Sequence, residues 1–514
     1  MKLHKLLYLS LLIPMMSACS LDKEPYGLAG LWESEGNAQK GLDAAYQPLY
    51  EEEGYGEGHW WAGPLSDDMM MNQDESEIYR LSTFSTPTNT FWAMKDNWQV
   101  MYRIIRRASD VVKNVPDINM SEAKKNEMLG EANFLCGYAY FFLAKRYGGV
   151  PFYDYNTPNE YNKPRETKEK TYQNIEKFLK ASIEHFSNVN GKELWIRGAN
   201  DWGRPTLGAA YGLLAKVYAH WGKMTEAKEN ALKVINSSQY ELATANNNGY
   251  DYLFSLEGEK SDEVLFNLNN QPVRHKGTVT SIITLSSSLS GNGWSMFAPT
   301  ESLRKAFKPG DLRRKVVMLE PGDKVTLLGK GVTITKENIS DMKTGYMAAK
   351  YLNAYKNASI YAWESGADVP LLRYSDVLLI YVEASMAEKG LNSSNRDAKT
   401  ADADILKYYN EVHVRAFGNN PKAAATEISF MDLVNERRCE LAYEDERHYD
   451  LVRWGLAQEV YGKSDDPYAV NGKGRTFDPK KDAHLPLPQA EIENSNGVLI
   501  NNPAPGYSDF GTAK

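Results

Sequence analysis

Apolar residues recur at helical spacing in five regions of the chain. The first region, 98–112, places one set of apolar residues on a single helix face: Met101, Ile104, Ile105, Ala108, Val111 and Val112. The other regions are 121–149, 171–235, 376–418 and 429–455. Because side chains at i, i+3, i+4 and i+7 lie on one side of a helix, each region predicts one or two amphipathic helices.

One of these regions has the pattern of a helix hairpin. Between 208 and 235, an apolar stripe is followed by Gly222 and then by a second stripe of small and apolar residues. Small residues, aromatic residues and a glycine at the turn are typical of a tetratricopeptide helix pair, and such pairs bury their faces by stacking. The sequence therefore predicts a mainly α fold, with a tetratricopeptide-like helix-pair scaffold over about 98–237 and 371–462.

Loop-rich inserts separate the helical regions. Residues 51–97 are rich in Gly, Asp, Asn and aromatic residues, whereas residues 240–300 and 310–370 contain short β-like runs such as KVTLLGKGVTIT, broken by Gly and Asn. We expect these large loop-rich inserts to carry a few short β-hairpins and to be followed by an irregular C-terminal segment, 464–514. Because loops on a rigid frame commonly carry binding sites, the three inserts are expected to form the ligand face.

The first 18 residues have the layout of a secretory signal peptide. Two Lys and a His precede an apolar run from Leu6 to Met16, and two small residues lead into Cys19. That run of 11 residues is shorter than the roughly 20 that a helix needs to cross a bilayer. The stretch before Cys19 resembles a bacterial lipobox, with Met16 where Leu is more usual. We therefore expect residues 1–18 to be a lipoprotein signal peptide and Cys19 to be the lipidation site.

The overall composition is that of an ordinary folded chain, with 42% hydrophobic and 25% charged residues. A net charge of −8 and the absence of any basic run of five residues argue against nucleic acid as a partner. Cys136 and Cys439 lie far apart, each within a helical apolar pattern. This placement favours two buried thiols over a disulfide.

Aromatic and acidic residues in the inserts are the candidate ligand contacts. Flat rings can stack on sugar C–H groups, while carboxylates bind hydroxyl groups. The candidates are Trp60, Trp61, Asp67, Asp68, Trp92, Trp294, Tyr361 and Trp363. Adjacent carboxylates such as Asp67 and Asp68 do not by themselves meet the roughly 5–10 Å separation of a glycosidase pair, so binding is favoured over catalysis. Trp98 and Trp454 fall within helical patterns and are expected in the core.

Two further patterns argue against a catalytic or metal centre. Glu436, Glu440 and Glu444 are spaced four apart and interleaved with arginines. This spacing favours structural ion pairs over acid–base catalysis, for example of the glutamates with Arg373 or of the arginines with Asp376. The eight His are scattered, and no HExxH or paired-Cys motif occurs. We therefore expect no catalytic residue, no metal site and no cofactor.

Several segments together resemble the SusD/RagB family of surface nutrient-binding lipoproteins. They are, in chain order, CSLDKEP (19–25), EANFLCGYAYFFLAKRYGGVPF (131–152), LLRYSDVLLIYVEAS (371–385), NERRCELAYEDERHYDLVRWG (435–455) and LPLPQAEIENSNGVLINNPAPGY (485–507). The resemblance implies a SusD-like domain over 19–514, anchored by lipid at the extracellular face of the outer membrane. It also implies that the protein acts as a hinged lid on a SusC-like TonB-dependent transporter. Ligand residues vary within this family, so none is carried over to this chain.

The hypothesis from the sequence is a non-enzymatic surface lipoprotein that captures an oligosaccharide and passes it to the transporter. A peptide-binding, RagB-like member of the same family is one alternative, which a groove with backbone donors and acceptors in place of exposed rings would favour. A secreted glycoside hydrolase is another, and turnover of a polysaccharide would favour it. A pure scaffold of helix repeats, which binds no small ligand, is the third.

Overall fold

The structure is a computed structural model that describes residues 32–51, 54, 60–72, 76–85, 89–154, 162–198, 201–243, 249–256, 260–271, 277–327, 329–352 and 365–501. The expected signal peptide, Cys19, Tyr361 and Trp363 lie outside the described residues, so what was expected of them stays a prediction. No helix in the described ranges is long and apolar enough to cross a membrane.

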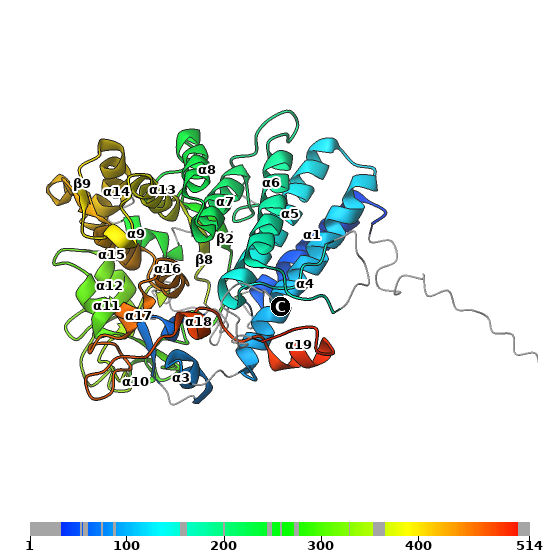
Figure 1. Ribbon diagram of the computed structural model, residues 1–514. Coiled ribbons are helices and arrows are strands. Elements are labelled where there is room, and N and C mark those ends of the chain that lie inside the picture. Colours follow the sequence, from blue (N-terminus) through cyan, green and yellow to red (C-terminus); the bar gives the residue numbers. More distant parts are fainter. Residues whose placement is uncertain are drawn as a thin grey trace, which may run out of the picture.

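Long helices pack side by side in a continuous row, each against the next one (Figure 1). The row consists of α1 (Glu35–Tyr46), α4 (Trp92–Asn114), α5 (Glu122–Tyr147), α6 (Lys168–Phe186), α7 (Leu207–Trp221), α8 (Met224–Ser237), α13 (Tyr374–Glu388) and α14 (Ala403–Ala416). This arrangement confirms the prediction of a mainly α fold built from packed helix pairs. The row also contains α1 and the first turn of α4, which lie upstream of the region with clear periodicity.

The ends of these helices use the capping residues that the sequence offers. The hydroxyl of Ser121 accepts a backbone hydrogen bond at the start of α5, and Thr206 does the same for α7. Gly148 and Gly222 follow these two helices with φ of +79° and +86°. A side chain with a Cβ is disfavoured in that left-handed region, which explains why the helices stop at glycine.

Two glycines of α5 allow a close approach to α6. A Cβ at Gly130 would lie 2.5 Å from the ring of Phe186, and one at Gly137 would lie 2.7 Å from Leu179. Both distances are far below a van der Waals contact, so a methyl group at either position would push the helices apart. The small residues in the middle of α5 therefore set the spacing of this helix pair.

The last helical region, 429–455, forms two helices that are separated by a turn. α15 (Phe430–Glu440) ends before a turn, and α16 (Arg447–Arg453) begins after it. Within the turn, Tyr443 and Asp445 have φ of +64° and +60°, which a continuous right-handed helix does not allow. The turn redirects the chain so that α15 and α16 contact different neighbours.

Short elements make up the remainder of the described chain. The short α-helices are α3 (Ser76–Ser82), α9 (Gly249–Leu253), α10 (Ser287–Ser290), α11 (Glu301–Ala306), α12 (Arg313–Val317), α17 (Ala457–Tyr461), α18 (Pro479–Asp482) and α19 (Gln489–Asn494). The 3₁₀ helices are η1 (Gln47–Tyr50), η3 (Gly63–Leu65), η4 (Val115–Asp117), η8 (Ser393–Asn395) and η9 (Pro421–Ala423).

The strands form antiparallel pairs and no larger sheet within the described ranges. The pairs are β1 (Met69–Met71) with β3 (Phe297–Pro299), β2 (Val264–Leu268) with β8 (Val369–Arg373), β4 (Met318–Leu319) with β7 (Met347–Ala348), β5 (Lys324–Leu327) with β6 (Lys330–Thr333), and β9 (Lys399–Thr400) with β10 (Ile428–Ser429). The β5–β6 pair is the local hairpin expected in KVTLLGKGVTIT. The other pairs join segments that are distant in the sequence.

Parts of the inserts assemble into one unit, which we call the loop lobe and define as the described residues of 60–85 and 277–352. Strand β1 of the first insert pairs with β3 of the second, with Met70 opposite Ala298. Residues 285–352 also contain an apolar cluster separate from the main core, which includes Leu285, Ile339 and Met347, and Met70 packs against it. The loop lobe therefore has a small core of its own and is not a set of independent loops.

Buried ion pairs confirm the structural role expected for the three glutamates around α15. Glu440 pairs with Arg373 (2.8 Å) and also with Arg313 and Arg415. Glu444 pairs with Arg373, at 2.6 Å. Burial alone would raise the pKa of Glu440, but the three arginines hold that pKa well below its ordinary value. A carboxylate so strongly ionised cannot serve as a proton donor at neutral pH.

The predictions for four other residues are also confirmed. Cys136 and Cys439 are buried free thiols. Trp98 and Trp454 are buried in the core. These residues lie on helical stripes, and helical periodicity correctly identified which side faces inward.

Candidate ligand-binding site

Trp60 and Trp61 were predicted as candidate ligand contacts, but the structure buries both side chains. They are 2% and 1% exposed, respectively. Trp60 contacts Phe297 and Tyr351, with ring centroids 6.5 Å and 5.8 Å away. The guanidinium of Arg146 lies 5.1 Å from the Trp61 ring. The pairing of β1 with β3 brings other aromatic residues over this segment. Burying so much apolar surface has a lower free energy than leaving it in water.

Asp67 and Asp68 are also buried, and arginines bind both of them. Asp67 accepts a hydrogen bond from Nε of Arg447 (2.9 Å) and lies 3.0 Å from Nη2 of Arg438. Asp68 accepts one from Nε of Arg438, at 2.6 Å. Burial would raise the pKa of Asp67, but the two arginines outweigh burial and hold it below its ordinary value. For Asp68, burial and the neighbouring Asp67 raise the pKa despite Arg438.

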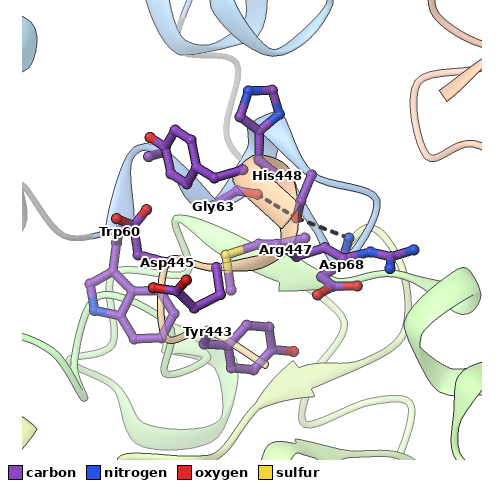
Figure 2. A pocket seen from close by; sticks show the side chains of 12 residues that line it. Trp60, Gly63, Asp68, Tyr443, Asp445, Arg447 and His448 are labelled. Carbon is purple, nitrogen blue, oxygen red and sulfur yellow. Dashed lines mark hydrogen bonds between the residues drawn. The ribbon is translucent and has the colours of Figure 1, made fainter. Parts of the chain in front are cut away.

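A small cavity lies beside these carboxylates (Figure 2). Its volume is about 30 Å³, and its lining includes Trp60, Asp68, Tyr443 and His448. In this wall the hydroxyl of Ser66 donates to the carbonyl of Gly63 (2.9 Å) and accepts from the backbone N–H of Asp68 (3.1 Å). A volume of this size holds about one water molecule and no sugar ring. Trp60, Trp61, Asp67 and Asp68 therefore form a structural junction between the loop lobe and α15–α16.

The remaining described candidates are closer to solvent. Trp92, the first residue of α4, is 44% exposed and packs edge-on against Phe91. Trp294 is half-buried, and its backbone N–H donates to the carbonyl of Ile282 (3.0 Å). Among the described candidate contacts, Trp92 and Trp294 are thus the two whose rings are accessible to solvent, fully or in part.

The loop that carries Trp294 is fixed by one carboxylate. Asp341 accepts hydrogen bonds from the hydroxyl of Ser286 (2.5 Å), from the hydroxyl of Ser295 and from the backbone N–H of Ser287 (2.8 Å). Burial would raise the pKa of Asp341, but these hydrogen bonds lower it to about 2. The carboxylate is therefore ionised at any physiological pH, and its hydrogen bonds tie together the two ends of the loop that carries Trp294.

Asn72 joins the inserts at the same place. Its amide nitrogen donates to the carbonyls of Ser295 and Asp341, both at 2.7 Å, and its amide oxygen accepts from the backbone N–H of Lys343 (2.7 Å). One side chain from the first insert thus connects the other two. The sequence analysis missed Asn72 and Asp341, because nothing local distinguishes them from the many other Asn and Asp residues of the inserts.

A larger opening lies elsewhere, between α4 and α19, and the sequence analysis did not predict it. Its volume is about 590 Å³, and its lining includes Trp98, Tyr102 and Tyr153. The side chain of Gln99 donates to Glu491 across it (2.9 Å). The lining residues come from three separate segments, so no local motif could have revealed this groove.

Three potential metal ligands meet in the described residues, namely His220, Glu446 and Asp450. Cations already pair with both carboxylates. Glu446 contacts Lys145 and Lys216, while Asp450 contacts Arg437 and Arg453. A metal ion would have to displace these ammonium and guanidinium groups or be repelled by them. The cluster is accounted for by its role in joining helices.

Comparison with known proteins gives consistent matches over almost the whole chain. A model described as the SusD family matches residues 152–507, and one described as starch-binding and associating with the outer membrane matches residues 21–219. A SusD-like protein of Formosa agariphila is 25% identical over 99% of this chain and 100% of its own length. A SusD-like protein of Bacteroides ovatus is 25% identical over 88% of this chain and 82% of its own length.

Solved structures share the fold at lower sequence identity. A SusD-like protein from Bacteroides fragilis matches with a TM-score of 0.74 at 19% identity, covering 94% of this chain and 100% of its own. Surface glycan-binding protein A from Bacteroides thetaiotaomicron, solved in complex with laminarihexaose, matches with a TM-score of 0.72 at 22% identity. That match covers 91% of this chain and 99% of the other. The fold is thus shared over most of the chain.

Proposed function

Since the chain belongs to the SusD family, we propose that it is a cell-surface lipoprotein that binds an oligosaccharide and passes it to a SusC-like TonB-dependent transporter. The observation that carries the proposal is the match to a glycan-binding protein solved with laminarihexaose, over 91% of this chain. A laminarin-binding SusD-like protein has the same fold, with a TM-score of 0.72 at 21% identity. In this proposal the anchor is the lipid on Cys19, and the protein does not cleave its ligand.

We assign the contact with the glycan to the surface of the loop lobe and the adjoining start of α4. Trp92 and Trp294 supply the aromatic faces there, and Asp341 and Asn72 keep the Trp294 loop in place before ligand arrives. A loop that is already ordered loses little conformational entropy on binding, so modest contacts suffice for useful affinity. Tyr361 and Trp363 remain proposed contacts on the basis of the sequence.

The test is calorimetry of the purified protein with laminarihexaose, other neutral oligosaccharides and peptides. In the proposal, Trp92→Ala and Trp294→Ala each weaken glycan binding by about 1–3 kcal/mol, the usual cost of removing an aromatic anchor. Trp195→Ala is the matched control, because Trp195 is half-buried, stacks on Tyr211 and lies in the connection between α6 and α7.

Three results would count against parts of this proposal. Unchanged glycan binding in both tryptophan variants removes these rings from the site. Binding of peptides in place of glycans identifies a peptide-binding member of the family. Release of reducing sugar from a polysaccharide by the purified protein identifies a hydrolase. The proposed transporter is tested by co-purification of a TonB-dependent barrel with the tagged protein from outer membranes.

A further inference from the structure

The groove between α4 and α19 lies apart from the loop lobe. Residues of 98–107 form one wall, Pro151, Tyr153, Asn162 and Lys163 contribute a second, and residues of 491–499 contribute a third. α19 lies beside α4, at a distance from α10–α12 of the loop lobe (Figure 1). The volume of the groove, about 590 Å³, falls within the roughly 300–1,000 Å³ typical of small-molecule sites. The groove is therefore large enough for a ligand of a few sugar rings.

Aromatic residues line the groove and hold one another in fixed orientations. The centroids of Trp98 and Tyr102 lie 5.0 Å apart, and those of Tyr102 and Tyr153 lie 5.9 Å apart at 77°. The hydroxyl of Tyr102 donates to the carbonyl of Pro151 (2.8 Å), which fixes the position of the ring. Tyr102 and Tyr153 are only half-buried. They can therefore offer apolar surface to the C–H groups of a sugar.

Cationic side chains surround this aromatic surface. Arg103, Arg106 and Arg107 follow one another along α4, and Lys163 lies on the segment opposite, with Nζ 5.6 Å from the Tyr153 ring. Glu491 is the one carboxylate in the described lining, and it already accepts a hydrogen bond from Gln99. The groove is thus locally positive on a protein whose net charge is −8.

Glu51 pairs with Arg103 and offsets its charge, but the partners of Arg106 and Arg107 leave much of the positive charge of these two residues in place. Arg107 donates to the carbonyl of Ala44 (2.7 Å) and to the amide oxygen of Gln47 (2.8 Å), which are both neutral. Arg106 pairs with Asp110 at 3.2 Å, and the side chain of Arg106 is 66% exposed. An exposed pair of this kind is weak, so an incoming anion can compete for the guanidinium.

We propose that this groove is a second carbohydrate subsite and that it takes sugars bearing carboxylate or sulfate groups. The proposal rests on the proposed function only in that the ligand is a carbohydrate. Rings stack on the sugar faces, while Arg106, Arg107 and Lys163 bind the anionic groups. An acidic oligosaccharide satisfies both features of the lining, whereas a neutral glucan satisfies only the aromatic one and a free inorganic anion only the cationic one.

The experiment is calorimetry of the full chain with three probes: an oligogalacturonate, a sulfated galactan oligosaccharide and laminarihexaose. We expect both acidic probes to bind, with affinity that falls when the salt concentration rises from about 0.05 to about 0.5 M, because salt screens these charges. We expect Arg106→Gln and Lys163→Gln to weaken acidic binding by about two- to fivefold each, and the double variant by about tenfold. Binding of laminarihexaose should not change.

Arg396→Gln is the matched control, because Arg396 is a partly exposed arginine that pairs with Glu459 at a site remote from the groove. Unchanged thermal midpoints of all variants establish that they are folded. Acidic binding that is indifferent to both groove substitutions overturns the proposal, and so does binding of laminarihexaose alone. In the second case the proposed function survives. If no carbohydrate binds at all, the proposed function fails as well.

Discussion

The junction at Asp67 allows a direct test of whether this carboxylate is structural or binds ligand. Asp67→Asn keeps the size of the side chain and removes its charge. Both carboxylate oxygens face Arg447, at 2.9 and 3.2 Å, and the two side chains are 5% and 10% exposed. Breaking a buried ion pair by removing one partner costs about 3–5 kcal/mol, because the other charge stays buried without compensation. We expect a loss of that size in the free energy of unfolding.

The loss is measured by urea denaturation, followed by tryptophan fluorescence and by circular dichroism. Glu427→Gln is the control, since Glu427 pairs with Lys399 on the surface with both side chains half exposed. Its cost should stay within about 1 kcal/mol. The affinity for glycan, corrected for the folded fraction, should be unchanged in Asp67→Asn, because a cavity of about 30 Å³ beside the junction excludes sugar rings.

The opposite pair of results would refute this reasoning. If the free energy of unfolding of Asp67→Asn lies within about 1 kcal/mol of that of the unmodified protein and its glycan affinity falls at least about tenfold, Asp67 contacts ligand. The arginines would then be ligand-binding residues as well. A change in the slope of the urea transition would indicate that the substitution alters the compactness of the denatured or native state or breaks two-state behaviour, and the free energy would then be obtained by another method.

Two further predictions concern acid stability and membrane attachment. Burial, together with the charge of Arg475, lowers the pKa of His448 to about 3, so the unfolded chain binds a proton below pH 6.5 that the folded chain does not. The contribution of His448 to the free energy of unfolding is therefore highest above pH 6.5 and falls as pH decreases towards 3, with a loss of about 2 kcal/mol at pH 5. Between pH 8 and 5, the urea midpoint should drop less in His448→Gln than in the unmodified protein. Cys19→Ala should move the protein from the membrane fraction to the soluble fraction, and continued membrane residence would contradict lipidation.

The helical scaffold could be predicted because its signals are local. Helical periodicity correctly placed Trp98 and Cys136 inside, and Ser121 and Gly148 mark the two ends of one long helix. The structural role of Glu440 was also predicted from its spacing among charged residues, and the expected partner Arg373 is one of the arginines that bind it. What the spacing did not reveal is the turn after Glu440, where positive φ values at Tyr443 and Asp445 interrupt the helix.

Whether an individual ring is buried or exposed could not be predicted, because it depends on contacts between distant segments. Trp60 and Trp92 both lie in the same insert, yet one is 2% exposed and the other 44%. Trp60 is covered because β1 pairs with β3, and Phe297 of that strand packs on the indole. The groove has the same property, since Gln99 and Glu491 meet across it from nearly opposite ends of the chain.

Consecutive charged residues of α15 explain how the loop lobe keeps its position on the helical row. Arg437 pairs with Asp376 of α13 at 2.8 Å, whereas its neighbour Arg438 pairs with Asp68 beside β1 at 2.6 Å. Apolar contacts alone are non-directional and would tolerate sliding of one unit on the other. Charge-assisted hydrogen bonds fix both distance and direction. Because one short helix binds the row through one residue and the loop lobe through the next, the surface around Trp294 is held at a defined place before any ligand binds.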